Sequence, residues 1–246
     1  MAAPVSNRLL DALSAETRKR IASRLESVPL PLRTSIYSPG VEPRYAYFIT
    51  SGIASVVTEM NEGIGVEVGL LGRESLPGAM ALLGSQPQAT TCFMQIAGTG
   101  LRMPYRELVA EYRLNAELHT RILEQVQYEG FSLSQLSACN RLHEIEERLA
   151  RWLLMVADRI DGNDLVLTQE FLAEMLGARR SSVTISAGTL QRAGLIEYRY
   201  GQVRILDRAK LESAACDCYP SLRRYQRDLY LSPPTVPGGL VRGYSG

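Results

Sequence analysis

The segment 167–206 constrains the fold more than any other stretch, because it combines two helical patterns with glycines that end each of them. Thr168 can cap a first helix, since its side-chain oxygen accepts a hydrogen bond from a free N–H group of the first turn. That helix has one apolar face, made of residues at helical spacing: Phe171, Leu172, Met175 and Leu176. Gly177 permits a sharp left-handed turn, and a second helix is predicted over residues 180–192, before Gly194.

Two short helices joined by a glycine turn form a helix-turn-helix, whose second helix fits the major groove of DNA. An arginine in its first turn can bridge the two acceptors of a guanine. The predicted base-reading residues are Arg180, Ser181, Thr184 and Ile185, of which the last suits a thymine methyl group. The predicted DNA-backbone contacts are Thr168, Arg179 and Ser182, with Thr184 a candidate for either role. A plain helical hairpin packed against another element is the alternative.

A β-hairpin is predicted directly after the second helix, at residues 195–199 and 202–206. Such a hairpin is a wing, and its Arg199 and Arg204 are expected to face the DNA backbone. Residues 179–210 hold seven basic and two acidic side chains, a surplus of five, whereas residues 1–164 hold 16 basic and 19 acidic ones. The chain has a net charge of only +1, so positive charge is concentrated on the motif, as phosphate binding requires.

The chain of 246 residues is long enough for two domains. Charged residues interrupt the N-terminal segment, so no signal peptide is expected, and no apolar run approaches the length of a membrane span. These features favour a cytoplasmic protein with no membrane partner, in which thiols stay reduced.

The four cysteines, Cys92, Cys139, Cys216 and Cys218, are too scattered for a zinc ribbon or a disulfide framework. A Cys-x-Cys pair can join a metal site, but it is more often two ordinary residues. No metal ligand is therefore predicted from the sequence.

The N-terminal part reads as helix over residues 6–27, with a second helical piece starting near Ser14. From about residue 32 to 104 the pattern changes to short β-rich runs broken by glycine, which favours a sandwich or barrel. The predicted strands are 45–49, 53–58, 66–71, 91–96 and 100–103, with a short helix over 77–83.

Residues 105 to about 160 read as helix again, with two neighbouring stripes near its middle. One stripe contains Leu118, Ile122, Gln125 and Glu129; the other contains His119, Leu123, Val126, Gly130 and Leu133. The second stripe has the alternating spacing of four and three residues that is typical of paired helices. We predict a homodimer with Leu118, Ile122, Leu123, Val126 and Leu133 at its seam, which implies a pseudo-palindromic DNA site. Packing against the β unit is the alternative.

The order of β unit, long helix and winged helix resembles the Crp/Fnr family of bacterial transcription regulators over about residues 6–220. The most specific similar segments are 47–52 (YFITSG), 66–69 (VEVG), 72–74 (GRE), 140–142 (NRL), 146–153 (EERLARWL) and the helix-turn-helix. The resemblance implies an α+β fold with an N-terminal β-roll (jelly-roll) sensor domain, a long dimerisation helix and a C-terminal winged helix-turn-helix. It also implies a homodimer whose β-roll is a sensor and whose winged helices bind promoter DNA and act with RNA polymerase. The β-roll binds either an unknown small molecule or none.

The corresponding domain limits are 1–104 for the sensor with its N-terminal helices, 105–138 for the dimerisation helix, 139–231 for the DNA-binding domain and 232–246 for a flexible tail.

The effector stays unknown because the chain departs from the family at the sensing positions. Members that bind cyclic AMP hold its phosphate with a Gly-Glu segment and an Arg-Ser or Arg-Thr pair. Here Gly78 and Thr90 match, but alanines replace the glutamate and the arginine, so cyclic AMP is disfavoured. Another alignment recruits Arg73 and Glu74 instead.

Iron–sulfur and haem sensing also fit the sequence poorly. No cysteine precedes Cys92, whereas the oxygen sensors of the family carry a cysteine cluster near the N-terminus. Haem ligation by His119 or His143 is an alternative, although a lone histidine on a helix is usually an ordinary residue. The second helix of the helix-turn-helix also differs from the best-known base-reading pattern of the family, Arg-Glu-x-x-x-Arg. Arg180 matches its first arginine, while Ser181 and Ile185 replace the glutamate and the second arginine. The operator is therefore expected to differ.

The predicted function is a DNA-binding regulator and not an enzyme. A metal-dependent enzyme on the β-roll is less favoured, because the only histidines lie on predicted helices. A protein-interaction or ligand-binding module without DNA binding is the other alternative, and the arginines of the motif and wing argue against it.

Overall fold

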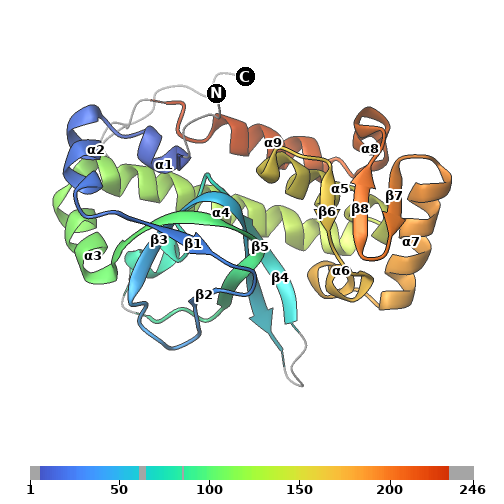
Figure 1. Cartoon of the computed structure of the whole chain (residues 1–246), viewed down its shortest axis with the longest axis horizontal. Coiled ribbons are helices and arrows are strands. Elements are labelled where there is room, and N and C mark those ends of the chain that lie inside the picture. The colour runs from blue at the N-terminus through green and yellow to red at the C-terminus, as the bar shows by residue number, and fades with distance from the viewer. Residues whose placement is uncertain (1–5, 61–64, 85, 233–246) are drawn as a thin grey trace.

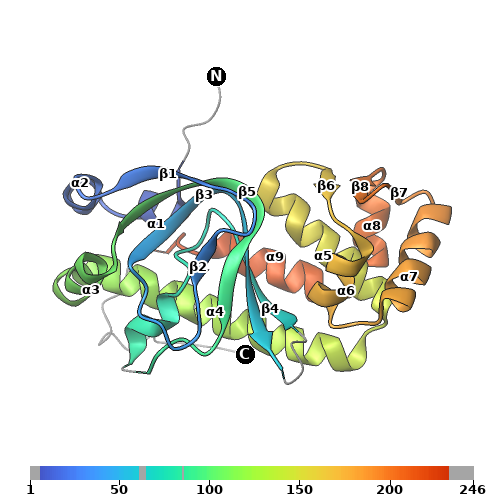
Figure 2. The same cartoon turned by 60° about the horizontal axis from the view of Figure 1, so that its bottom comes forward.

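The computed structural model describes residues 6–60, 65–84 and 86–232. A β-rich unit lies on the left of Figure 1 and a mostly helical unit on the right. Helix α4 (Ala116–Leu142) extends from one to the other, and Figure 2 shows it passing along the lower edge of the molecule. Among the described residues, no helix is long and apolar enough to cross a membrane.

The N-terminal helices are shorter than the sequence pattern predicts. Helix α1 (Arg8–Asp11) is capped by Asn7, and α2 (Ala15–Ala22) is capped by Ser14. The predicted helix 6–27 ends early because strand β1 (Glu26–Leu30) pairs with β5 (Thr91–Pro104). Pro29 is tolerated in β1 because this strand lies at the edge of the sheet, where one side needs no N–H donor.

All strand pairs of the β-roll are antiparallel, and its main path runs β1-β5-β3-β4, with β2 (Ser35–Tyr37) also on β5. Residues 45–49 and 53–58 belong to one long strand, β3 (Tyr45–Glu59), and the runs 91–96 and 100–103 are both parts of β5. Strand β4 (Gly65–Leu71) and the 3-10 helix η2 (Ala79–Leu83) lie near their predicted places.

The glycines taken as strand breaks instead let β3 and β5 cross closely. A Cβ atom on Gly98 would lie 2.0 Å from the Ser51 carbonyl oxygen, and one on Gly52 would lie 2.6 Å from that of Ile96. Gly52 also has a φ of 80°, a conformation that disfavours other residues. The two glycines therefore mark a bulge and not a chain break.

The long helical region contains two bends that the pattern does not reveal. Helix α3 (Tyr105–Leu114) ends at Asn115, whose side chain accepts a hydrogen bond from Leu118 N at 2.9 Å and so caps α4. Helix α4 continues to Leu142, beyond the predicted limit of 138. A capping box of Glu144 and Glu147 then starts α5 (Ile145–Ile160).

Part of the predicted dimer seam needs correction. Leu118 and Ile122 are 0% exposed, because they pack into the subunit's own core with residues such as Leu9, Ile21 and Phe48. Gln125, on the same stripe, exchanges hydrogen bonds of 2.9 Å with the backbone of Leu76. This stripe packs on the β-roll, and Val126 of the neighbouring stripe also packs against the same core. Leu123 and Leu133 of the neighbouring stripe stay the candidates for dimer contacts.

The C-terminal unit is a winged helix built on α5. Its elements are β6 (Asp164–Val166), α6 (Gln169–Leu176), α7 (Arg180–Arg192), β7 (Ile196–Arg199), β8 (Gln202–Ile205), α8 (Arg208–Ala214) and α9 (Cys218–Asp228). Its strands pair in the order β6-β8-β7, of which β6 was not predicted. Their apolar side chains share one core with α5, α6 and α7. Residues 233–246, most of the predicted tail, lie outside the described residues.

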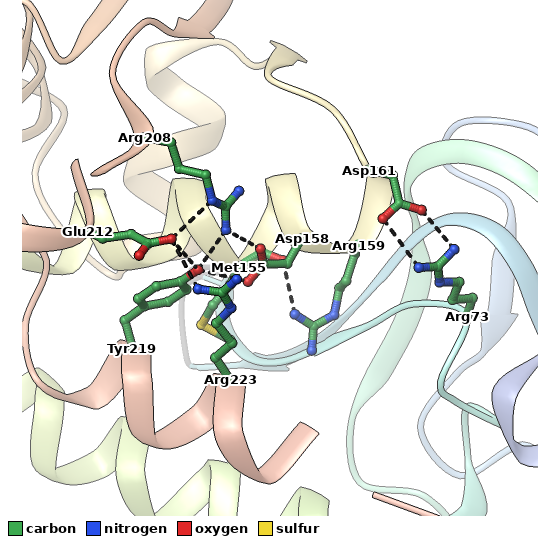
Figure 3. Close-up of polar contacts among 9 residues, drawn as sticks. All are labelled: Arg73, Met155, Asp158, Arg159, Asp161, Arg208, Glu212, Tyr219 and Arg223. Atoms are coloured by element: carbon green, nitrogen blue, oxygen red, sulfur yellow. Dashed lines mark hydrogen bonds and ion pairs between the residues drawn. The ribbon is translucent and has the colours of Figure 1, made fainter. Parts of the chain in front are cut away.

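A polar network holds α8 and α9 against α5 (Figure 3). Arg208 pairs with Asp158, and it donates to the Tyr219 hydroxyl at 2.7 Å and to Glu212 at 3.0 Å. The Tyr219 hydroxyl in turn donates to Asp158 at 3.0 Å. These hydrogen bonds and ion pairs join side chains of α5, α8 and α9. The short segment between α8 and α9 is therefore held in a fixed position.

Candidate nucleic-acid interface

The turn between α6 and α7 has the geometry that the glycine pattern predicts. Thr168 Oγ1 accepts a hydrogen bond from Phe171 N at 3.2 Å, which caps α6. Gly177 has a φ of 56°, and the Ala178 N–H group donates to the Ala173 carbonyl at 2.9 Å. The next helix, α7, is then anchored inward by Val183, Ala187 and Leu190, all buried. Its opposite face is left to solvent.

The four predicted base-reading residues share that exposed face of α7. Arg180, Ser181, Thr184 and Ile185 are all exposed, and Ile185 is 68% exposed in spite of its apolar side chain. Thr184 Oγ1 lies 2.8 Å from Gln169 Oε1 and 2.9 Å from the Arg180 carbonyl oxygen. Gln169 therefore belongs to the site, a role that the sequence pattern did not indicate.

The N-terminus of α7 suits an anion. Arg179 is its N-cap residue, no side chain caps the helix, and its first turn contains no acidic residue. The first N–H groups of the helix therefore stay available, and the helix dipole favours a negative group there. Ser182, half-buried, lies in this turn. Among the described residues, no carboxylate lies within ion-pair distance of Arg179 or Arg180.

The two wing arginines are exposed but already have acidic partners. Arg199 Nε lies 3.1 Å from Glu197 Oε1, and Arg204 Nε lies 2.5 Å from Asp164 Oδ1. The second pair follows from the strand register, which places Asp164 of β6 opposite Arg204 of β8. Tyr200, at the tip of the wing, is fully exposed with a φ of 50°, and sequence reasoning gave it no role.

A surface groove of about 370 Å³ joins the helix-turn-helix to the wing. It is lined by Thr168, Gln169, Arg180, Tyr198, Tyr200 and Gly201. The groove brings a predicted base reader, Arg180, next to the α6 cap and the wing, so one ligand can contact all three.

The β-roll contains a separate cavity of about 280 Å³. It is lined by Tyr37, Val56, Thr58, Val68, Gly69, Leu70, Leu71, Gly78, Met80, Gln88, Thr90, Tyr128, Glu129, Ser132 and Leu133, none of which is a lysine, arginine or histidine. Burial raises the pKa of Glu129 to about 7. A phosphate group would therefore find no cationic partner among these residues.

The alternative alignment through Arg73 and Glu74 does not place either residue in this cavity. Glu74 accepts a hydrogen bond of 2.9 Å from Arg159 on α5. Figure 3 shows the second pair, in which Arg73 lies 2.7 Å from Asp161. Both residues connect the β-roll to α5.

Three of the four cysteines lie together although they are far apart in the sequence. Cys139, Cys216 and Cys218 form a buried cluster beside His143, while Cys92 lies alone in β5. Sequence spacing did not reveal this group, because its members meet only through the packing of α9 on α4.

Comparisons with known proteins agree with both halves of the fold. Residues 28–113 match the model of the cyclic nucleotide-binding domain, and residues 147–214 match that of the Crp-like helix-turn-helix domain. The arrangement of the two defines a class of DNA-binding transcriptional regulators, and the chain belongs to the Crp/Fnr family. No curated protein matches the chain.

Solved structures of this family share the fold. A Crp/Fnr-family protein from Eubacterium rectale has a TM-score of 0.67 at 20% identity, over 84% of this chain and 96% of its own. A CRP-family regulator from Thermus thermophilus has a TM-score of 0.63 at 24% identity, over 77% and 96%. The c-di-GMP-responsive regulator CLP of Xanthomonas campestris has a TM-score of 0.63 at 18% identity, over 79% and 100%.

Proposed function

We propose that this protein is a homodimeric transcription regulator that reads a pseudo-palindromic promoter site with α7 and acts in the cytoplasm with RNA polymerase. The single observation that carries the proposal is the first turn of α7. There, two arginines are exposed and free of ion pairs among the described residues, beside a groove that continues to the wing. Arginines in this state contact bases and phosphates without first breaking an internal ion pair.

Dimer formation is proposed from the second stripe of α4, the one that contains Leu123 and Leu133. Leu133 is exposed and Leu123 half-buried in the single chain, although both are apolar residues on a long helix. Pairing two copies of α4 along this stripe removes their apolar surface from water. It also places two α7 helices on one face of the DNA. Because the two helices are related by a two-fold axis, the DNA site that they read is expected to be pseudo-palindromic.

We also propose that the β-roll does not bind cyclic AMP as an effector. The cavity of the β-roll offers a phosphate no cationic side chain, and its one carboxyl group, on Glu129, would repel the anion when ionised. Calorimetric titration of the protein with cyclic AMP is expected to give no binding isotherm. Stoichiometric binding would overturn this part alone.

The decisive experiment is selection from a random duplex library with purified protein and no added ligand. We expect enrichment of a two-fold symmetric site. Salt-sensitive binding without enrichment would show that an effector is obligatory, and the absence of any binding at low salt would favour a protein-interaction module.

The dimer is tested separately by light scattering after size-exclusion chromatography. Leu133→Glu is expected to produce monomers, because two carboxylates would meet in the seam. Leu114→Glu, on the exposed end of α3, is the matched control and is expected to leave the dimer intact. Dimers of Leu133→Glu would place the seam elsewhere.

A further inference from the structure

The cysteine cluster lies where the DNA-binding unit meets the long helix. Cys139 and His143 are one helical turn apart at the C-terminal end of α4. Cys216 and Cys218 lie between α8 and the first turn of α9. One ligand atom of each of the four residues lies within 4.8 Å of the others, and the three cysteines are buried. Two residues at the end of α4 and a Cys-x-Cys segment at the start of α9 thus meet at one point.

The separations within the cluster fit a tetrahedron around a single ion. Cys139 Sγ and Cys216 Sγ are 3.5 Å apart, and Cys218 Sγ and His143 Nδ1 are 3.6 Å apart. Zinc bonds of standard length place two sulfurs roughly 3.8 Å apart and a sulfur and a nitrogen about 3.6 Å apart. A disulfide needs sulfurs about 2 Å apart. An iron–sulfur cluster needs wider spacing between some of its ligands, because its four protein ligands are spread over two or four iron atoms.

The histidine ring is oriented as metal-bound histidines are. Nδ1 faces the sulfurs, while Nε2 lies 3.2 Å from Asp217 Oδ1. A carboxylate in this position keeps the proton on Nε2, so Nδ1 offers its lone pair to the ion. Gln135 Nε2 donates to Cys218 Sγ at 3.1 Å, and N–H groups of this kind stabilise a thiolate.

The charges around the cluster also call for bound thiolates. Arg148 and Arg151 are buried, and their Nε atoms have no hydrogen-bond partner, although each side chain donates one hydrogen bond through its Nη atoms. Neither forms an ion pair among the described residues. Both guanidinium groups lie near enough to Cys139 to interact with a negative charge on it. Three thiolates on a divalent cation leave one negative charge, which offsets part of the cost of burying two guanidinium groups.

From this geometry we propose that Cys139, His143, Cys216 and Cys218 bind one Zn²⁺ ion that fastens α9 to the end of α4. Three thiolates and an imidazole select Zn²⁺ among common divalent cations, and four protein ligands leave no open position, as in a structural site. The proposal goes beyond DNA binding and does not depend on it.

The cluster is assembled by contacts outside it. On α9, the Tyr225 ring stacks on Phe131 of α4 with centroids 4.6 Å apart, and Tyr219 joins the network with Asp158 and Arg208 (Figure 3). These contacts hold the Cys-x-Cys link in place beside α4. The bound ion then fixes the winged helix relative to α4, at the point where α4 gives way to α5.

The first test is metal content of the full chain purified from zinc-supplied cells, measured by plasma mass spectrometry. We expect one zinc per chain. Replacement by Co²⁺ is expected to give the intense visible bands of a tetrahedral site together with a near-ultraviolet sulfur-to-cobalt transition. An iron–sulfur absorption spectrum, a Cys139–Cys216 disulfide in the purified protein, or zinc-free protein that takes up none at equimolar zinc would overturn the proposal.

Variants locate the site. Cys216→Ser is expected to lose bound zinc, whereas Cys92→Ala, which changes the remaining cysteine in β5, is expected to keep one zinc per chain. Asp217→Asn alters an exposed side chain that contacts His143 and lies 3.9 Å from Cys218 Sγ, so the fold should persist while zinc affinity falls about 10–100-fold. Equal zinc content in Cys216→Ser and the unaltered chain would contradict the assignment. Circular dichroism confirms that each variant is folded.

Discussion

Charged side chains behave differently in two regions of this protein, the exposed face of α7 and the buried contact between the β-roll and α5. On the proposed DNA-binding face, Arg179 and Arg180 are exposed and unpaired among the described residues. Between the β-roll and α5, by contrast, Glu74 and Arg159 are almost fully buried and joined at 2.9 Å. Exposed charges interact weakly with each other and stay available to a ligand, whereas buried charges destabilise the fold unless they are paired. The same residue type should therefore affect binding at one surface and stability at the other.

The largest expected effect is on the buried pair. Arg159→Met leaves the Glu74 carboxylate buried without its partner, so we expect a loss of about 3–5 kcal/mol in the free energy of unfolding. Denaturant titration measures this loss. Arg73→Ala removes the neighbouring but exposed pair with Asp161 and should cost less than about 1 kcal/mol. A similar loss in both variants would erase the contrast between buried and exposed charges, and the double variant Glu74→Gln/Arg159→Met should recover part of the stability.

The next effect concerns specific DNA binding. Arg180→Ala is expected to weaken binding to the selected site by about 1–3 kcal/mol and to relax the preference at one base pair. Repeating the library selection with the variant measures both. Arg113→Ala, on an exposed position of α3, is the control and should change neither. An unchanged sequence preference of Arg180→Ala would remove this residue from base reading.

A buried carboxyl group gives the stability of the folded chain a pH dependence. Glu67 accepts hydrogen bonds from Ser55 at 2.6 Å and Trp152 Nε1 at 2.7 Å, yet burial raises its pKa from 4.5 to about 7. The folded chain therefore binds this proton more tightly than the unfolded chain. The resulting stability is complete below pH 4.5 and is lost as the pH rises to about 7.

Glu67→Gln should abolish that contribution. Between pH 5 and 7.5 the unaltered protein is expected to lose stability relative to the variant, by on the order of 1–3 kcal/mol. Denaturant titrations across this pH range measure the difference. Glu129, whose pKa burial also raises to about 7, titrates in both proteins, so it cancels in the comparison. A constant difference at every pH would show that Glu67 does not titrate in this range.

The sequence predicted the helix-turn-helix well, because its signals are local. A capping threonine, a glycine turn and apolar residues at helical spacing all act within a few residues, and each appears in the structure at Thr168, Gly177 and Val183. Local signals misled where glycines serve a neighbouring strand: Gly52 and Gly98 ease a crossing between β3 and β5 that no single window of sequence contains.

Tertiary packing decided the remaining differences. Apolar residues at helical spacing do not say whether a stripe faces a second subunit or the same one, and Leu118 and Ile122 face their own core. The cysteine cluster joins residues about 75 positions apart, so only the packing of α9 on α4 reveals it. Likewise, Asp164 becomes the partner of Arg204 through the register of β6 and β8, and not through proximity in the sequence.

The smallest expected effect is the loss of DNA affinity when a wing arginine is changed. The wing arginines are exposed, like those of α7, but they are paired, like the buried Arg159. Because Arg199 already interacts with Glu197, its contact with a phosphate gains less than an unpaired arginine would. We expect Arg199→Ala to weaken binding to all sequences alike and to make the salt dependence of binding shallower by roughly one phosphate contact. Fluorescence anisotropy at several salt concentrations, with specific and random duplexes, measures both. Glu197→Gln frees Arg199 and should strengthen binding to both duplexes. A loss confined to the specific duplex in Arg199→Ala would instead make the wing a reader of bases.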